Sequence, residues 1–389
     1  MTSTGNKERL DRLLSFIQHD PLNLALRREA IGEAFLCQEW GKVAQLLEDG
    51  LAFHPDDVDL LDAAAAWHQH QHRFDDAIEM LSMARLRGID ALRLRYQAAR
   101  AHFMQMRFAE ALDELRIPDL ARAVPASLTL RARCLHGLER IEEAIENCNR
   151  RLEVEPHDAD TAGLLALLYY EQSRLSEASA LAEQALSRVP DQLEAMLTVA
   201  SLYSAACEYS KARSAFNALL LSHPSCGRAW LGRALADMST ARFDEAKASI
   251  DKAAQYMPNH IGTWHVLAWL NVLSGDANGA EAAFERALEL DRNFAETHGG
   301  LAVAAAMQGR EIEAQEMIRR ALRLDANAMS TQYARLLVLR SMGRHDDARA
   351  VVEAFLARPV PNGDMQMRDL LIRRMPASIA RGVSDKTLH

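Results

Sequence analysis

Apolar side chains in this sequence follow helical spacing in two short stretches of each repeating unit, with a turn between them. Trp264 and Ala268 lie four residues apart in one stretch, and Ala280 and Phe284 have the same spacing in the next. Such spacing places side chains on one face of an α-helix. Between the stretches, Gly275 can adopt the positive φ that commonly ends a helix. The pattern predicts a helical hairpin with a tight turn.

Two series of alanines indicate that this hairpin is repeated along the chain. One series has steps of 34 residues, with a single step of 33, at Ala77, Ala111, Ala144, Ala178, Ala212, Ala246, Ala280, Ala314 and Ala348. The second series stands on the preceding helix, at Ala65, Ala99, Ala132, Ala166, Ala200, Ala234, Ala268 and Ala302. Small residues let two helices cross closely, and a larger residue there would overpack the crossing by about 1–3 kcal/mol. A fixed period in this range is typical of stacked-repeat proteins.

Prolines mark the boundaries between units. They recur at intervals of 34 residues at Pro21 and Pro55, and again at Pro156, Pro190, Pro224 and Pro258. Proline ends a helix or occupies its first turn, so each of these residues marks a junction. We therefore expect about ten hairpins, at residues 24–57, 58–91, 92–125, 126–158, 159–192, 193–226, 227–260, 261–294, 295–328 and 329–362.

Both ends of the chain depart from the repeat. Residues 1–23 hold a single apolar stripe, which predicts an N-terminal capping helix over about 6–18. Residues 363–389 predict a second capping helix, with an apolar face that includes Met367 and Leu371, followed by a disordered tail. A contact of this second helix with a partner or an anionic surface remains an alternative.

The third unit is irregular. Pro118 falls where its second helix would still run, so we expect that helix to end near Arg116 and a longer loop to follow. The shorter step before Ala144 lies nearby. These features predict a joint that divides the repeats into an N-terminal array, 24–125, and a C-terminal array, 126–362.

The unit resembles the tetratricopeptide repeat, whose signature is W-x2-L-G-x2-Y, then A-x3-F, then P. Trp264-x2-Leu267, followed by Ala280-x3-Phe284, matches the signature, and Ala212-x3-Phe216 followed by Pro224 matches its second half. The resemblance covers roughly residues 8–362. It implies an all-α fold, a right-handed α-solenoid or superhelix of about ten helical hairpins with N- and C-terminal capping helices.

Composition narrows the functional classes. The chain has 389 residues and a formal net charge of −9, without a long basic stripe, so we expect no nucleic-acid partner. It has no uncharged apolar run of about 18 residues, so we expect no membrane span. Because no apolar signal stretch precedes the repeats, we expect a cytoplasmic protein. Five cysteines without a Cys-x-x-Cys pair are typical of reduced thiols that fill small core spaces.

The sequence carries no familiar catalytic motif, so we expect no enzyme and no cofactor. It lacks a Gly-x4-Gly-Lys-Ser/Thr loop, a His-Glu-x-x-His pair and a Gly-x-Ser-x-Gly elbow. His68 and His72 would share one helix face, so a zinc or nickel site with a third ligand is an alternative. We favour a solvated helix end, where histidines complement the helix dipole. Acid pairs that include Asp57 and Asp76 stand at helix starts, where capping explains them.

In proteins of the tetratricopeptide repeat family, the first helices line a concave groove, and the second, fifth, ninth and twelfth positions of each unit face it. Carried onto this sequence, the early groove is basic and aromatic, with Arg93, Tyr96, Arg100, Phe103, Arg133 and His136. The later groove is apolar, with Tyr170, Leu231, Leu235, Met238, His265 and Trp269. Exposed apolar patches and aromatic or arginine anchors mark binding surfaces. The alternative, in which these side chains pack on one another, stays open.

These observations favour a non-catalytic scaffold or adaptor that binds a peptide or helix of a partner protein in its groove. Arg93 and Arg100 would orient an acidic part of that partner, and apolar anchors would hold the rest. A chaperone or regulator of a bacterial secretion or surface-assembly system is a second interpretation, and a metal-dependent enzyme is a third. The sequence leaves the partner, the pathway and the oligomeric state undetermined.

Overall fold

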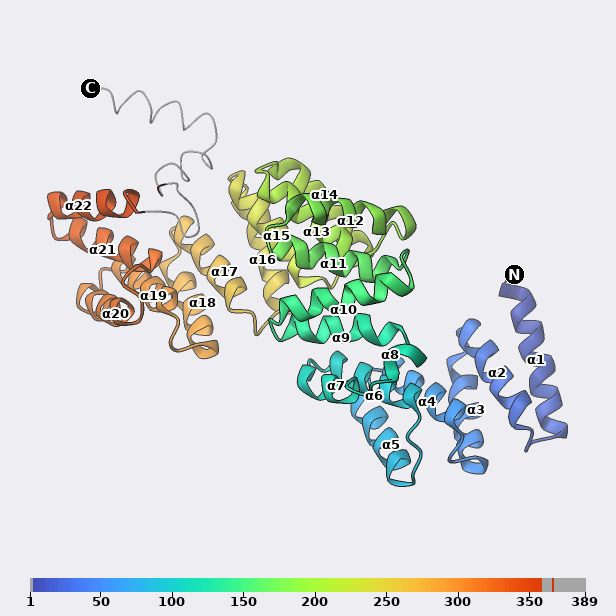
Figure 1. Cartoon of the computed structure of the whole chain (residues 1–389). Helices are drawn as coiled ribbons and strands as arrows, with labels where there is room; N and C mark the ends of the chain where they lie inside the picture. Colours follow the sequence, from blue (N-terminus) through green and yellow to red (C-terminus); the bar gives the residue numbers. More distant parts are fainter. Residues whose placement is uncertain (1–2, 359–365, 367–389) are drawn as a thin grey trace. The chain divides into compact units, whose positions relative to one another are not determined.

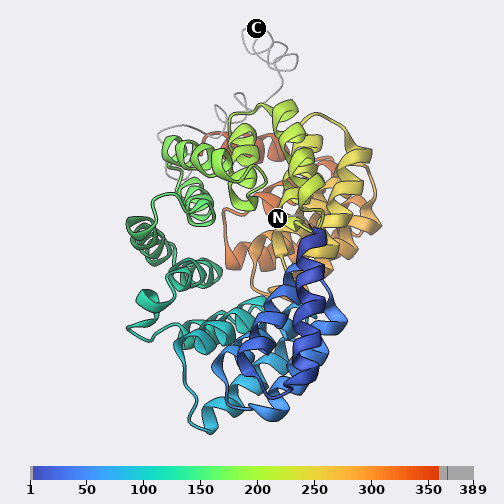
Figure 2. The same cartoon turned by 90° about the vertical axis from the view of Figure 1, so that its right-hand side faces the viewer.

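The computed structural model describes residues 3–358 and residue 366, and in this part of the chain it contains 22 α-helices. The helices follow one another as antiparallel pairs, and the two members of a pair lie side by side in both views (Figure 1 and Figure 2). The predicted all-α repeat fold is therefore confirmed. The chain forms two compact units, residues 1–195 and 196–389.

The first unit holds a single N-terminal helix, five hairpins and the start of a sixth. Its helices are α1 (Ser3–His19), α2 (Leu24–Leu36), α3 (Trp40–Phe53), α4 (Val58–His70), α5 (Phe74–Leu86), α6 (Leu92–Met104), α7 (Phe108–Glu114), α8 (Leu120–Ala123), α9 (Ala126–Gly137), α10 (Ile141–Val154), α11 (Ala159–Glu171), α12 (Leu175–Arg188) and the first residues of α13 (Leu193–Ala205).

The second unit contains most of α13 and the remaining helices. These are α14 (Tyr209–Ser222), α15 (Gly227–Ser239), α16 (Phe243–Tyr256), α17 (Ile261–Leu273), α18 (Ala277–Leu290), α19 (Ala295–Met307), α20 (Glu311–Leu324), α21 (Met329–Ser341) and α22 (His345–Leu356).

The observed hairpins follow the predicted units closely. Each first helix begins at the first residue of a predicted unit, as at Leu24 and Ile261. The lone helix α1 packs on α2 and buries Leu10 and Leu13. In the third hairpin α7 ends at Glu114, as expected, but the predicted loop was wrong in part, because residues 120–123 form the short helix α8.

Both alanine series lie in the core, which explains why the sequence keeps small residues at these positions. The second-helix series from Ala77 to Ala348 is 0–3% exposed, and the first-helix series from Ala65 to Ala302 is 0% exposed. The two helices of a hairpin pack closely on each other, as α11 and α12 or α15 and α16 do. Close approach of the backbones leaves no room for a longer side chain there.

Every hairpin turn contains one residue in the left-handed region of backbone conformation. Three of these residues are glycines, Gly275, Gly309 and Gly343, with φ between 69° and 77°. The other seven carry side chains and have φ between 56° and 61°, at Gln38, His72, Met106, Glu139, Ser173, Cys207 and Ala241. The backbone N–H of the residue after the left-handed position still donates to a carbonyl of the first helix, as in the hydrogen bond from Arg242 N to Asp237 O at 2.9 Å. Repeated geometry therefore overrides the local preference for glycine.

Two phenylalanines pack directly against glycines of the following hairpin. Phe216 of α14 faces Gly232 of α15, and Phe284 of α18 faces Gly300 of α19. A Cβ atom added to either glycine would lie 2.2–2.3 Å from ring carbons. Both rings are fully buried, at 0–2% exposure, so each glycine makes room for a ring from the preceding hairpin.

Cysteines do not all serve as core fillers. All five are free thiols, and Cys134 and Cys148 are buried as expected. Burial raises the pKa of each of these two thiols to about 12. The prediction was wrong for Cys207, which is exposed and occupies the left-handed position of a hairpin turn, outside the packed helices.

Two sequence-based expectations lie outside what the structure tests. The predicted capping helix and tail at 363–389, with Met367 and Leu371, lie outside the described residues. The predicted division after residue 125 stays a prediction. Among the described helices, none combines the length and apolar character needed to cross a lipid bilayer.

Candidate functional site

The first helices of successive hairpins pack against one another within each unit and form a continuous row. In the first unit the row runs α2, α4, α6, α9 and α11, and in the second unit it runs α15, α17, α19 and α21. We call the side of this row that carries the predicted groove residues the first-helix face. Each unit is described by itself below.

In the first unit, α6 supplies four of the predicted residues. Arg93 is exposed and donates from Nη2 to the carboxylate of Asp59, one hairpin earlier, at 2.6 Å. Tyr96 and Phe103 are half-buried and pack against the core. Arg100 is exposed and has one hydrogen bond, from Nη1 to the side-chain oxygen of Gln97 at 3.4 Å. Arg93 is therefore held by a carboxylate, whereas Arg100 is not.

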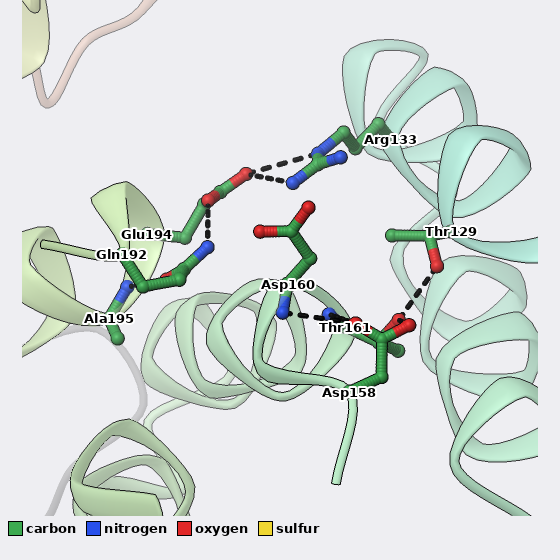
Figure 3. A network of polar contacts seen from close by, with 8 residues as sticks. All are labelled: Thr129, Arg133, Asp158, Asp160, Thr161, Gln192, Glu194 and Ala195. Atoms are coloured by element: carbon green, nitrogen blue, oxygen red, sulfur yellow. Dashed lines mark hydrogen bonds and ion pairs between the residues drawn. The ribbon is translucent and has the colours of Figure 1, made fainter. Parts of the chain in front are cut away.

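Helix α9 contributes Arg133 and His136, and each side chain contacts an acid from a later helix. Arg133 donates from Nε and Nη2 to Oε1 of Glu194, at 3.1 and 2.9 Å (Figure 3). Burial disfavours the Arg133 cation, but the Glu194 carboxylate outweighs this effect and raises the pKa of Arg133. The His136 Nε2 atom lies 2.8 Å from a carboxylate oxygen of Glu171.

Glu194 is held in place by its own neighbours at the start of α13. The side-chain amide of Gln192 donates to Glu194 Oε2 at 2.5 Å, while Gln192 Oε1 accepts from the backbone N–H of Ala195 at 2.7 Å (Figure 3). Gly163 of α11 makes this possible, because a Cβ there would lie 2.0 Å from the Gln192 side-chain oxygen. The carboxylate that pairs with Arg133 is thus positioned by a glycine two helices earlier.

The start of α11 brings two further acids to this face. Asp158 is the N-cap of α11 and accepts hydrogen bonds from the backbone N–H groups of Asp160 and Thr161. The Thr161 hydroxyl lies 2.7 Å from that of Thr129 in α9, which ties the two helices together (Figure 3). Tyr170, near the end of α11, is half-buried.

These elements enclose a cavity of about 250 Å³ between α6, α9 and α11. Four predicted residues line it together: Tyr96, Arg100, Phe103 and Arg133. Arg93, His136 and Tyr170 do not. Sequence reasoning missed Asp160, although it stands at the second position of its unit, which is a groove position in the predicted register. We call this cavity the dipolar pocket.

In the second unit, the predicted apolar residues of α15 are divided between core and surface. Leu231 and Met238 are half-buried and pack against a core cluster that includes Ile250. Leu235 is 44% exposed. Leu231 and Met238 thus cover the core, and none of the three residues lines the cavity that Trp269 borders.

His265 of α17 is a packed histidine. Its Nε2 atom lies 2.8 Å from the hydroxyl of Thr297. Its ring makes T-shaped contacts with the rings of Phe284 and Phe294, with centroids 5.4 and 5.3 Å away. Burial lowers the pKa of His265, and the nearby carboxylate of Glu296 opposes this only in part. The neutral imidazole is therefore the stable form at neutral pH.

Trp269, one turn further along α17, borders an apolar cavity of about 520 Å³. Its ring packs on Phe284 and Tyr333, with centroids 6.1 and 5.8 Å away. Helices α21 and α22 supply the remaining walls, and the lining residues are Trp269, Met329, Gln332, Tyr333, Leu336, Val351, Val352 and Phe355. We call this cavity the Trp269 cavity. The predicted register could have found Tyr333, which stands at the fifth position of its unit.

The three histidines near the end of α4 have separate surroundings. His68 Nδ1 lies 4.0 Å from an Asp76 carboxylate, and the His70 ring packs on Trp40 with centroids 4.0 Å apart. His72 occupies the left-handed turn position and packs edge-on against Phe74. Within the described residues, no group of three or more histidine, cysteine or acidic side chains is arranged to hold a metal ion.

Acidic residues at the helix starts are caps or first-turn residues, as predicted. The Asp57 carboxylate accepts from the backbone N–H of Leu60 at the start of α4, and Asp75 and Asp76 stand in the first turn of α5. Asp276 likewise caps α18 through the backbone N–H of Gly279. Such caps satisfy orphan backbone donors and complement the helix dipole.

Known structures support the same fold. Human IFIT1, solved as a dimer with m7Gppp-AAAA, has a TM-score of 0.53 at 13% identity and covers 85% of this chain and 89% of its own. A monomeric IFIT1 mutant solved with Gppp-AAAA has a TM-score of 0.54 at the same identity and the same coverage. A tetratricopeptide repeat protein from Parabacteroides merdae has a TM-score of 0.47 at 19% identity, covering 63% of this chain and 97% of its own. At 13% identity, the likeness to the two IFIT1 structures concerns the fold alone.

Sequence comparison identifies the repeats. No curated protein matches this chain. The sequence profile of the tetratricopeptide repeat matches residues 169–238 and 271–339, which span α12 to most of α15 and α18 to most of α21. The same alanine spacing and the same paired helices continue through the described hairpins outside these two segments. The chain belongs to the tetratricopeptide repeat proteins, whose stacked hairpins serve as protein-interaction scaffolds.

Proposed function

We propose that this protein is a non-catalytic scaffold that binds an amphipathic segment of a partner protein on its first-helix face. The observation that carries this proposal is the Trp269 cavity. Its volume of about 520 Å³ lies within the range of about 300–1,000 Å³ that is usual for ligand pockets. Its walls are almost entirely apolar, so water inside it forms few hydrogen bonds. Transfer of an apolar side chain from solvent into the cavity is therefore favourable.

The energetics favour capture of one or two large apolar side chains. Met329 and Tyr333 border the cavity and remain 53% and 39% exposed. Burying a leucine or phenylalanine of a partner there would contribute about 1.5–3 kcal/mol per side chain. Two such anchors, together with backbone and rim contacts, give the affinity that is expected of a specific but reversible peptide complex.

Charge next to the cavity indicates what should flank these anchors. A second cavity of about 650 Å³ shares Gln332 and Val351 with the Trp269 cavity. It is lined by four arginines: Arg319, Arg335, Arg344 and Arg358. Among the described residues, Asp347 pairs with Arg344, and the other three arginines form no ion pair with a carboxylate. A partner segment with apolar anchors beside acidic residues matches both cavities.

The chain's own C-terminal sequence is a poor match for the same place. Residues 367–375 have apolar spacing, but they carry three arginines, Arg368, Arg373 and Arg374, against a single acid, Asp369. Like charges beside the arginine-lined cavity would repel this segment. The charge pattern therefore favours a partner protein over the chain itself as the occupant.

Selection from a phage-displayed library of random peptides tests the proposal. We expect enriched peptides to carry two large apolar residues near aspartate or glutamate. Met329→Glu should remove the enrichment, because it places a charge at the mouth of the cavity. Trp269→Ala should do the same by removing one wall.

Two surface variants serve as matched controls. Ile312→Glu changes a residue that is 84% exposed on α20 and lies outside both cavities, and Leu273→Ala alters the exposed end of α17. Both should retain the selected peptides. Failure to enrich any peptide, or full retention of the peptides by Met329→Glu, would refute the proposal.

A further inference from the structure

The dipolar pocket in the first unit carries two charges that remain after its other charges are paired. Arg133 is paired with Glu194, and Asp158 accepts from Arg151 at 2.8 Å. Arg151 also pairs with Glu155 at 2.6 Å, so its single positive charge is shared by two carboxylates. Arg100 and Asp160 are left, and neither forms an ion pair with another described residue. The pocket therefore presents one cation and one anion to a ligand.

The Asp160 carboxylate lines the dipolar pocket and points away from the backbone of α11. Figure 3 shows it beneath the Arg133–Glu194 pair, and the only interaction drawn from Asp160 leaves its backbone nitrogen. Arg133 acts on Asp160 through space, but its hydrogen bonds go to Glu194. The carboxylate thus keeps its hydrogen-bonding capacity for an incoming donor.

An aromatic ring lines the same pocket as the two charges. Tyr96 is half-buried and lines the pocket together with Arg100 and Asp160. Burial raises the pKa of Tyr96, and beside it the Arg100 cation lowers that pKa while the Asp160 carboxylate raises it. Both charges therefore act close to the tyrosine. A cationic side chain that reaches Asp160 can also lie against this ring.

Volume and charge exclude several ligand classes. The pocket, at about 250 Å³, is below the usual size of about 300–1,000 Å³ for small-molecule sites, and it suits one or two peptide side chains. A phosphate or a nucleic-acid backbone would face the carboxylates of Asp158 and Asp160. A ligand with positive charge only would face Arg100.

We infer that the dipolar pocket binds a partner peptide in which a basic residue stands next to an acidic one. The basic side chain pairs with Asp160 against the Tyr96 ring, and the acidic side chain pairs with Arg100. This inference rests on the proposed function, because it takes the ligand to be a segment of a partner protein. It differs from the expectation that Arg93 and Arg100 together hold an acidic group, since Arg93 is paired with Asp59.

An array of synthetic decapeptides tests the inference. All 400 dipeptides stand at the centre of a constant alanine–serine background, and labelled full-length protein is applied at low salt. We expect Lys or Arg next to Asp or Glu to give the strongest signals, about tenfold above neutral pairs. A tenfold change corresponds to about 1.4 kcal/mol, which two partly exposed ion pairs can supply.

Single substitutions separate the two charges. Asp160→Asn should remove the preference for the basic residue and keep that for the acidic one, and Arg100→Gln should do the reverse. Arg93→Gln is the matched control, because it removes a cation of the same helix that lies outside the pocket. Its array pattern should be unchanged. All three side chains are exposed, so each variant should fold normally, with an unchanged circular dichroism spectrum.

The outcomes distinguish this inference from the proposed function. If both pocket variants keep the pattern of the original chain while phage-selected peptides still require the Trp269 cavity, the inference is wrong and the scaffold proposal stands. If no peptide binds in either experiment, both fail. Arg100-dependent binding of a capped oligoadenylate RNA, with no charge preference on the array, would assign the pocket to nucleic acid and overturn the inference.

Discussion

The contact between Phe284 and Gly300 offers a direct test of how neighbouring hairpins fit together. Gly300→Ala adds one methyl group at a site where it would lie 2.3 Å from two ring carbons of Phe284. The ring is fully buried and also packs on Trp269 and His265, so it has no free direction in which to move. The methyl group must therefore strain the junction between α18 and α19.

Two opposing effects set the size of the change. Alanine is favoured over glycine inside a helix by about 1 kcal/mol, whereas overpacking of a rigid core costs about 1–3 kcal/mol. The overlap with Phe284 is severe, so we expect a net loss of about 1–2 kcal/mol. For a unit of this size, such a loss lowers the midpoint of thermal unfolding by about 2–8 °C.

Gly32→Ala is the control for helix propensity. Gly32 lies inside α2, and a Cβ added there would meet no atom within 4 Å. That variant should gain up to about 1 kcal/mol. If Gly300→Ala lowers the free energy of unfolding and Gly32→Ala raises it, the neighbouring ring, and not helix propensity, determines the effect at Gly300.

Urea unfolding followed by circular dichroism measures both variants, and each unfolding transition is fitted separately because the chain holds two compact units. A double-mutant cycle then isolates the contact. Phe284→Leu should relieve the strain of Gly300→Ala, with a coupling of at least about 1 kcal/mol. Stabilisation by Gly300→Ala, or additive effects in the cycle, would refute the packing argument.

Three further predictions concern single side chains. The contribution of His265 to stability should be complete above about pH 6.5 and should fall as the pH decreases, because burial lowers the pKa of His265 in the folded state and the unfolded chain binds the proton first. In thermal melts at several pH values, His265→Gln should flatten this decline, and an unchanged slope would exclude the histidine as its cause. Asp237→Ala should cost about 1–3 kcal/mol in urea unfolding, because Asp237 is fully buried and its carboxylate lies 2.7 Å from Arg213 and 3.8 Å from Arg233. An unchanged midpoint would contradict this. Ala241→Gly should stabilise the chain by up to about 1 kcal/mol, since Ala241 has a φ of 57°, and a lower melting temperature would show that the turn is unstrained.

The sequence predicted the repeat architecture well because the repeat is written in local patterns. The spacing of Trp264 and Ala268 predicted a helix that the structure places at Ile261–Leu273. Gly275 and Asp276 signalled the turn and the next cap, and both have the predicted geometry. A short helix at residues 120–123 was missed, because four residues carry no helical period.

Most turns gave no such signal. Gln38, His72 and Ala241 occupy the same left-handed position as Gly275, and nothing in their chemistry predicts it. They adopt this conformation because the two helices that they join are already packed together. Tertiary contacts override local preference at these positions.

The candidate site was only partly predictable for the same reason. Position within the repeat identified Tyr96, Arg100 and Trp269 as surface candidates, and each lines a cavity. Position did not reveal that Asp59 pairs with Arg93, since the two residues stand on different helices. Nor did it reveal the contact between Arg133 and Glu194, which are 61 residues apart.

The amino-acid sequence by itself determined the unit of construction: its length, its two helices and the small residues at their crossing, because all of these depend on neighbours three to 34 positions away. Only the tertiary structure decided which charges are neutralised and which remain available. Pairing depends on distances between helices of different hairpins, and no repeat pattern encodes those distances. Arg93 and Arg133 form ion pairs with Asp59 and Glu194. Arg100 and Asp160 form no ion pair with another described residue, and this distinguishes them within the first-helix face.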